Sequence, residues 1–376
     1  MSFPLDLAAP ASLGLNQQAL DGLHALVERH IGEGRYPGAQ FAVARQGKLA
    51  VCASFGDARV TAPRVPARED TLWLLYSNTK VVTACAVWIL VEQGALRFTD
   101  PVAMHLPGFQ VNGKGDITVL QLLTHQGGFP NADVTPEAWE DHNLLRHTVC
   151  NFLLEWTPGS KVVYHGLSAH WVAAVLIEAL AKVDYRDFIR ENVIEPLGLG
   201  RELFIGLPNN EHGRAADMHE PSQDWAHQSR RDKNNTPAIR RAGVPGGGGY
   251  GTARAMVAFY QMLAQRGTLN GVRLLTPQMV EYVTRNHTGD RVDEYMGMPM
   301  HRGIGPHSRG TTAAIRGLGS LASPRTFGHG GVGSSYCWAD PDSGVSFAYL
   351  TNSRVPDPWH SERLDLISNF VHTAIQ

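Results

Sequence analysis

The sequence predicts an α+β fold in which both ends of the chain build one central antiparallel sheet flanked by helices, and the middle forms a largely helical lobe. Helix and hairpin patterns occur near both ends, whereas helical patterns separated by Gly- and Pro-rich connections fill the middle. We expect one unit over residues 1–376, with an α/β lobe from about residues 17–76 and 240–376 and a helical lobe from about residues 77–239. The cleft between such lobes favours a small-molecule site.

The N-terminal segment predicts a helix followed by a β-hairpin. Apolar residues recur every three or four positions across residues 17–33, which is helical spacing. Two β-rich runs follow, QFAVAR at 40–45 and KLAVCASFG at 48–56, and the pair Gln46-Gly47 between them is typical of a tight turn.

The C-terminal segment repeats this combination in reverse order. SSYCWAD at 334–340 and VSFAYLTN at 345–352 flank the turn sequence PDSG, which predicts a second hairpin. The amphipathic pattern of residues 361–375 then predicts a closing helix.

The middle of the chain predicts helices over residues 77–94, 117–127 and 168–192. Glycine- and proline-rich connections separate them, including VPGGGGYG, whose stretch PGGGG at 245–249 we interpret as a turn before a helix. Residues 205–240 and 285–325 are rich in loops, and we expect them to shape specificity.

Composition excludes several classes of partner. The 376 residues are 43% hydrophobic and carry a formal net charge of −2, which gives no electrostatic case for nucleic acid or for an anionic membrane. The longest uninterrupted apolar run, AVWILV, is far shorter than the roughly 20 residues that span a bilayer. The N-terminal residues lack a secretory pattern, so we expect a soluble, cytoplasmic protein. Its oligomeric state is not predicted.

The sequence gives no sign of a metal or another cofactor. The four cysteines, Cys52, Cys85, Cys150 and Cys337, are scattered without the C-x-x-C spacing of zinc sites, and the histidines form no ligand-spaced set. We therefore expect catalysis by side chains alone.

Ser77 and Lys80, in LLYSNTKVV, are the first candidate catalytic pair. If a helix begins near Ser77, residues three apart lie on one face with Cβ atoms about 5–6 Å apart. A serine needs a neighbouring base to act as a nucleophile, and a lysine can serve when desolvation lowers its pKa. An N-cap serine followed by a solvated lysine is the alternative that this spacing leaves open.

Two later segments complete a known order of motifs. Tyr164 follows the Pro-Gly turn in WTPGSKVVYHG, and the small triplet His329-Gly330-Gly331 lies on a predicted strand in FGHGGVGSS. This order, with framework stretches such as VEQGALRFTDPVAMHLPGF and ITVLQLLTHQGGFP, resembles the serine β-lactamase and penicillin-binding-protein superfamily. The match is most similar to the class C β-lactamase-related branch that includes family VIII carboxylesterases, and it implies a β-lactamase-like fold.

The resemblance implies a role for each matching residue. Ser77 would be the acylated nucleophile, and Lys80 would share its proton and position the hydroxyl. Tyr164 would act as general base and then as acid toward the leaving group, as a phenolate coupled to Lys80. The backbone N–H groups of Ser77 and Val332 would form the oxyanion hole. Substrate would contact His329, Gly330, Gly331, His165 and Trp338.

Two departures from the family pattern bear on the substrate. The tyrosine motif is Tyr164-His165-Gly166 instead of Tyr-x-Asn, and His-Gly-Gly replaces Lys-Thr-Gly, so a fixed cation gives way to a mostly neutral side chain. Both changes weaken recognition of the carboxylate that β-lactams and peptidoglycan stems share. They favour a serine hydrolase that cleaves carboxylic esters with short acyl chains.

Other functions stay open from the sequence. The same fold supports β-lactamases, D-amino-acid peptidases or amidases, and an acyl-enzyme that excludes water becomes an acyltransferase. A binding protein without turnover is the alternative from another class. We expect His125, at the end of a predicted helix, to be structural and not catalytic. The expected partner is a small-molecule ester or amide substrate.

Overall fold

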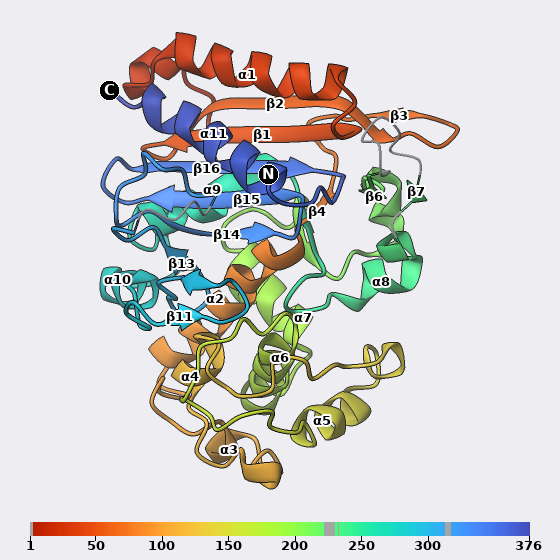
Figure 1. Cartoon of the computed structure of the whole chain (residues 1–376), viewed down its shortest axis with the longest axis vertical. Helices are drawn as coiled ribbons and strands as arrows, with labels where there is room; N and C mark the ends of the chain where they lie inside the picture. Colours follow the sequence, from red (N-terminus) through yellow and green to blue (C-terminus); the bar gives the residue numbers. More distant parts are fainter. Residues whose placement is uncertain (1–2, 222–229, 232, 313–316) are drawn as a thin grey trace.

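The computed structural model describes residues 3–221, 230–231, 233–312 and 317–376. Its centre is a seven-stranded antiparallel sheet with the strand order β13-β14-β15-β16-β1-β2-β3. The two chain ends meet where β1 pairs with β16, so the predicted sheet built from both ends is confirmed (Figure 1). The strands are β1 (Gly38–Arg45), β2 (Lys48–Arg59), β3 (Val65–Pro66), β13 (His307–Ser308), β14 (Phe327–Gly331), β15 (Ser335–Asp340) and β16 (Val345–Thr351).

Both predicted hairpins form at the expected positions. Gln46 and Gly47 have φ angles of 56° and 74°, the left-handed conformation that a tight two-residue hairpin turn requires. The second hairpin joins β15 to β16. A third hairpin, β14 with β15, carries the small triplet toward the centre of the molecule.

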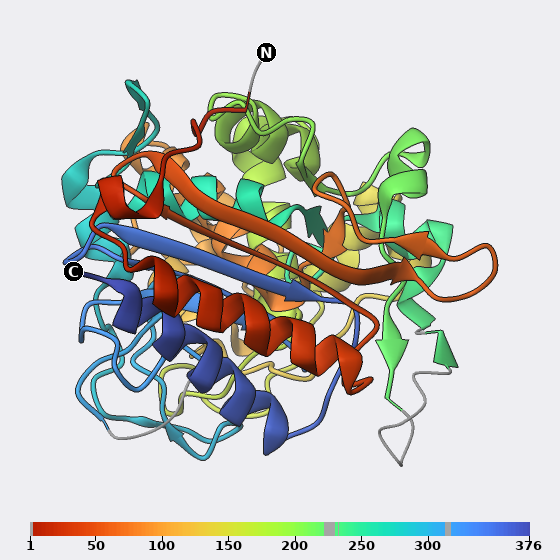
Figure 2. The ribbon, with the colours of Figure 1, turned by 90° about the horizontal axis from the view of Figure 1, so that it is seen from above.

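Helices cover both faces of the sheet. Helices α1 (Gln17–Gly32) and α11 (Trp359–Ala374) lie side by side on one face, and α9 (Ala253–Ala264) packs against the other (Figure 2). The side chain of Asn16 caps α1 by accepting a hydrogen bond from the N–H of Ala19. The apolar stripe predicted over residues 17–33 is therefore the face of α1 that packs on the sheet.

The helical region lies below the sheet in Figure 1. Its buried centre is the contact between α2 and α6, and one hydrophobic core continues from there to the α9 side of the sheet. The helices of this region are α2 (Thr79–Glu92), α3 (Val102–His105), α4 (Val119–Leu123), α5 (His142–Cys150), α6 (Ser168–Ala181) and α7 (Tyr185–Ile189). Two further helices, α8 (Pro237–Ala242) and α10 (Pro277–Thr284), lie beside it.

Two predicted helices are shorter than expected, for local reasons. Helix α4 begins at a capping box formed by Thr118 and Gln121, and the chain leaves helical geometry at His125, whose φ is 62°. The helix predicted over 168–192 is divided at Lys182, where φ is 61°, into α6 and α7. Within the described residues, no helix is long and apolar enough to cross a membrane.

A small three-stranded sheet leads the chain into the candidate site. It consists of β4 (Trp73–Leu74), β8 (Gly249–Gly251) and β5 (Leu203–Ile205), with β8 in the centre. The glycine run before β8 forms the turn that the sequence predicts, and α9 follows it. Strand β4 ends three residues before Ser77, so this sheet positions the candidate nucleophile.

Candidate active site

Ser77 lies in a 3-10 turn, Tyr76–Asn78, immediately before α2 begins at Thr79. Tyr76 has a φ of 44°, a conformation that costs a non-glycine residue about 1–3 kcal/mol and persists only where neighbouring contacts hold it. The amide of Asn78 supplies such contacts, donating to the carbonyl of Leu75 at 3.0 Å and to Oγ of Ser335 on β15 at 2.9 Å. The turn is thus fixed against the central sheet.

Lys80 is fully buried in the first turn of α2. Its Nζ lies 3.1 Å from Oγ of Ser77 and 2.6 Å from the carbonyl oxygens of both Gly166 and Gly246. Burial, and then the charge of Arg302, hold the pKa of Lys80 well below its usual value. A neutral amine donates its two N–H bonds to the two carbonyls, which leaves its lone pair directed at the Ser77 hydroxyl.

Tyr164 completes the group around the serine. Its hydroxyl lies 2.9 Å from Oγ of Ser77, across 87 residues of sequence. Burial raises the pKa of Tyr164 to about 12, although the hydrogen bond with Ser77 opposes this shift. The phenol is therefore protonated near neutral pH and donates to Oγ, which differs from the phenolate that the resemblance implies. Burial thus favours the neutral amine of Lys80 and the protonated phenol of Tyr164.

The glycines of the small triplet permit a close approach between β14 and the serine turn. A Cβ on Gly331 would lie 2.8 Å from the carbonyl oxygen of Leu75, two residues before Ser77, and 2.4 Å from Oγ of Ser335 on β15. His329 is buried beside them, and burial, followed by the charges of Lys80 and Arg302, lowers its pKa well below the usual value. This histidine is therefore neutral and supplies no positive charge.

A cavity of about 360 Å³ opens over the catalytic group. Ser77, Tyr164 and the triplet line it, and so does Val332, which is 57% exposed. Ser77 and Val332, whose N–H groups would form the oxyanion hole, thus line the same cavity. The lining also includes several largely apolar side chains: Tyr295, Met296, Met298, Met300, Tyr336 and Leu364.

A protein-family model described as Beta-lactamase matches residues 23–370. The chain belongs to this family. Among curated relatives of the family, "Esterase/beta-lactamase LipL" of Mycobacterium tuberculosis is 29% identical over 322 residues, covering 77% of this chain and 71% of that protein.

Solved structures of the family agree with this assignment. A penicillin-binding-protein homolog from Caulobacter crescentus superposes with a TM-score of 0.80 at 29% identity, covering 95% of this chain and 98% of the other. A family VIII carboxylesterase gives the same TM-score at 28% identity, with the same coverage. The fold predicted from the order of motifs is confirmed, and the chain is a hydrolase of the serine β-lactamase fold.

Two of the residues expected to contact substrate lie elsewhere. Trp338 is buried between the sheet and α11, where its ring stacks on His372 at 4.5 Å and its Nε1–H donates to Oγ of Ser368. His165 is also buried; Nδ1 faces the carbonyl of Val163 at 2.7 Å and Nε2 accepts from the N–H of Phe129. Neither side chain lines the cavity, so both expectations were wrong.

His125 supports the catalytic tyrosine from behind, in line with the structural role expected for it. It is buried, its ring lies 4.8 Å from the Tyr164 ring, and Nδ1 accepts from the N–H of His165. The two histidines thus hold the segment on which Tyr164 lies.

Asp293 and Arg302 were not among the site residues predicted from the sequence. Their side chains form a buried ion pair behind Tyr164, in the loop region expected to shape specificity. An aspartate and an arginine nine residues apart in a loop match no motif, so no local signal identifies them.

Tyr164→Phe tests the role of the phenol without removing the ring. We expect kcat for an alkyl ester such as ethyl butyrate, whose alkoxide leaving group needs a proton, to fall about 10²–10³-fold, because the variant keeps the packing against His125 but loses the proton on the hydroxyl. Measuring the acid released, beside a thermal unfolding curve that stays near that of the wild type, checks this. A kcat within fivefold of the wild type would rule out proton transfer by Tyr164.

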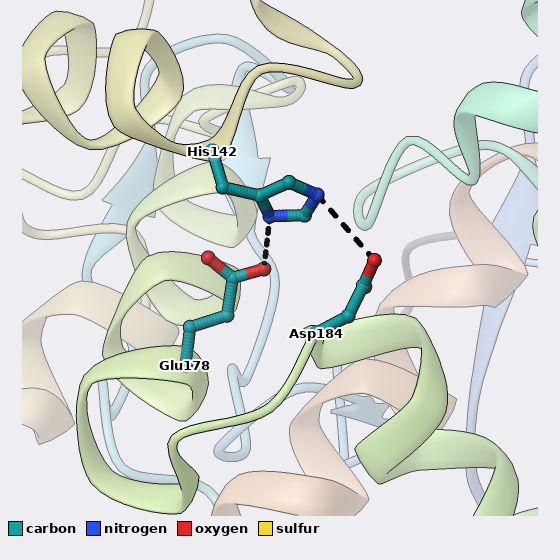
Figure 3. A group of neighbouring side chains, drawn as sticks. All are labelled: His142, Glu178 and Asp184. Atoms are coloured by element: carbon teal, nitrogen blue, oxygen red, sulfur yellow. Dashed lines mark hydrogen bonds and ion pairs between the residues drawn. The ribbon is translucent and has the colours of Figure 1, made fainter.

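One group of possible metal ligands lies outside the cavity, where His142 stands between Glu178 and Asp184 (Figure 3). Nδ1 of His142 is 2.6 Å from Glu178 and Nε2 is 3.4 Å from Asp184, so each ring nitrogen faces a different carboxylate. Arg186 already pairs with Asp184 at 2.6 Å. We interpret the group as a polar contact that ties α5 to α6 and α7. A separate cavity of about 490 Å³ adjoins Asp184 and Arg186 and contains none of the predicted site residues.

Proposed function

We propose that the protein hydrolyses carboxylic esters with short, uncharged acyl groups through an acyl-enzyme on Ser77. The observation that carries this proposal is the position of Oγ of Ser77, 3.1 Å from Nζ of Lys80 and 2.9 Å from the hydroxyl of Tyr164, at a cavity wall. A serine with a base and a proton donor in contact has what acyl transfer requires.

The reaction follows from these contacts. Oγ of Ser77 attacks the ester carbonyl carbon while its proton passes to the amine of Lys80. The N–H groups of Ser77 and Val332 stabilise the negative oxygen of the tetrahedral intermediate. The bond to the alcohol oxygen then breaks, and that oxygen takes a proton from Tyr164, which recovers one from Lys80. Water repeats the sequence on the acyl-enzyme and releases the acid.

The charges around the cavity favour a neutral substrate. Arg302 lines it but is paired with Asp293, and His329 is neutral. Asp357, another lining residue, would repel an anion. The guanidinium of Arg302 is thus already hydrogen-bonded to Asp293, so a substrate carboxylate gains little from it. This argues against β-lactams and D-amino-acid peptides as the preferred substrates.

Cavity size favours a compact substrate. Small-molecule sites span about 300–1,000 Å³, and 360 Å³ lies near the lower end of this range. Two similar proteins, the esterase/beta-lactamase LipL and a family VIII carboxylesterase, support ester cleavage as the reaction.

A pair of esters that differ only in charge tests the proposal. We expect kcat/KM for methyl p-nitrophenyl adipate to exceed that for p-nitrophenyl hydrogen adipate by about tenfold or more, equivalent to about 1.4 kcal/mol. Nitrocefin and a D-alanyl-D-alanine peptide should turn over more slowly than the neutral ester.

A preference for the charged adipate, nitrocefin or the peptide would contradict the proposal. Added butanol distinguishes the acyltransferase, because a transferase would form the butyl ester in place of the free acid. Loss of all turnover on every substrate would favour a binding protein.

A further inference from the structure

A buried ion pair lies directly behind the candidate tyrosine. The guanidinium of Arg302 contacts Oδ2 of Asp293 through Nη2 at 2.6 Å and through Nε at 3.2 Å. The exposed fractions of the two residues are 2% and 0%. Burying two charges costs free energy that their mutual attraction does not fully recover. Because the Asp293–Arg302 pair lies beside Tyr164, we infer that it does more than stabilise the fold.

Asp293 holds the backbone of the tyrosine. Its Oδ1 accepts hydrogen bonds from the N–H groups of Tyr164 and Tyr295, both at 3.1 Å. A β-bridge between Val162 and Asp293 reinforces this connection. The carboxylate thus joins the loop around Tyr295 to the segment that carries the phenol.

Arg302 places a permanent positive charge against the same ring. Its guanidinium carbon lies 4.9 Å from the centre of the Tyr164 ring, and Nζ of Lys80 lies 5.2 Å from that centre. Arginine does not lose its proton in proteins, whereas a buried lysine does so readily. Two positive groups against one ring repel each other. The free energy is lower when the lysine is neutral, because arginine keeps its proton.

We propose that Arg302, fixed by Asp293, is a positioning residue that orients Tyr164 and keeps Lys80 in the amine form that accepts the serine proton. This inference rests on the proposed function and names a device that tunes its base. Consistent with this geometry, burial lowers the pKa of Lys80 most, and the positive charge of Arg302 lowers it further.

The other groups near Lys80 do not provide this charge. Burial lowers the pKa of each neighbouring imidazole, so these histidines are neutral near pH 7, and Tyr164 is protonated. The groups that contact Lys80 or interact with its charge are Ser77, Tyr164, His125, His170, His329 and Arg302.

The test is the double variant Arg302→Gln/Asp293→Asn, which removes both charges and avoids leaving a buried carboxylate unpaired. Arg240→Gln/Asp217→Asn is the matched control, because Arg240 and Asp217 form another buried pair, at 2.7 Å, with no contact to the catalytic group in the described structure. Two rates are followed from pH 5 to 10: kcat/KM for p-nitrophenyl butyrate, and inactivation by a p-nitrophenyl phosphonate. The second reports the nucleophilicity of Ser77 whatever the natural substrate is.

We expect the acidic limb of both profiles to move upward by about one pH unit in the Arg302/Asp293 variant and to stay in place in the control. The charge of Arg302 acts on Lys80 and that of Asp293 does not, so removing the pair raises the pKa of Lys80 and the amine forms only at higher pH. Activity lost at pH 7 should therefore return in part at pH 9. A folded variant whose limb coincides with that of the control would overturn the inference.

Arg302→Lys decides the question if the double variant does not fold. The Asp293 carboxylate favours the protonated form of the substituted amine, so this variant keeps a positive charge but loses the two-pronged contact with Asp293. We therefore expect an unchanged acidic limb and a kcat lowered about fivefold or more. A shifted limb or an unchanged kcat would contradict the inference. Wild-type protein that reacts with the phosphonate but cleaves no ester would refute the proposed substrate class and leave this test intact.

Discussion

Lys80→Met is expected to lower kcat/KM for p-nitrophenyl butyrate about 10³-fold or more at pH 8, because methionine fills a similar volume but accepts no proton. The carbonyls of Gly166 and Gly246 each lose a donor, which costs about 1–3 kcal/mol apiece. Together these losses are a large part of the roughly 5–15 kcal/mol that stabilises a typical domain. Circular dichroism and thermal unfolding establish that the variant is folded before its rate is compared.

The dependence of wild-type kcat/KM on pH is a second test of Lys80 as the base. Because the pKa of Lys80 lies well below its usual value, kcat/KM should rise with pH through that lowered pKa and level off before the usual range of lysine. Tyr164, with a pKa of about 12, should stay protonated across the plateau. A limb near the ordinary lysine pKa, or a Lys80→Met variant within tenfold of the wild type, would exclude Lys80 as the base.

Ser77→Ala is expected to have the largest effect, a loss of about 10⁴-fold or more in kcat with no burst of p-nitrophenol. The side chain is small and only partly buried, so the free energy of unfolding should change by less than about 1 kcal/mol. Ser361→Ala is the matched control, since this serine lines the same cavity and its hydroxyl donates to Asp357 at 2.6 Å. The control should retain most of the activity. Comparable losses in both variants would mean that the cavity, and not Ser77, limits the rate.

Much of the fold could be predicted because its signals are local. The two hairpins follow from β-rich runs on either side of turn residues such as Gly47, which readily takes the positive φ of a tight turn. The contact between Ser77 and Lys80 is local too, since residues three apart at the start of a helix face the same way. Helix ends were less predictable, because Lys182 adopts a left-handed conformation that only Gly and Asn commonly signal.

Long-range contacts were beyond the local pattern. The meeting of Tyr164 with Ser77 was expected only through the family resemblance, and Asp293 and Arg302 had no motif at all. The position of Trp338 could not be predicted for a different reason. Both faces of β15 are buried, so the alternation of side chains did not say which face would meet α11 and which would meet α9.

The acyl-enzyme itself is the most direct test of the central claim that Ser77, Lys80 and Tyr164 act together on an ester. The protein is mixed with p-nitrophenyl butyrate, quenched in acid within the burst phase, digested, and analysed by mass spectrometry. The account predicts a butyryl group on the peptide that contains Ser77, formed more slowly in Tyr164→Phe and absent in Lys80→Met at the same time point. A butyryl group on another residue, or ester turnover without any covalent adduct under conditions that show a burst, would contradict it.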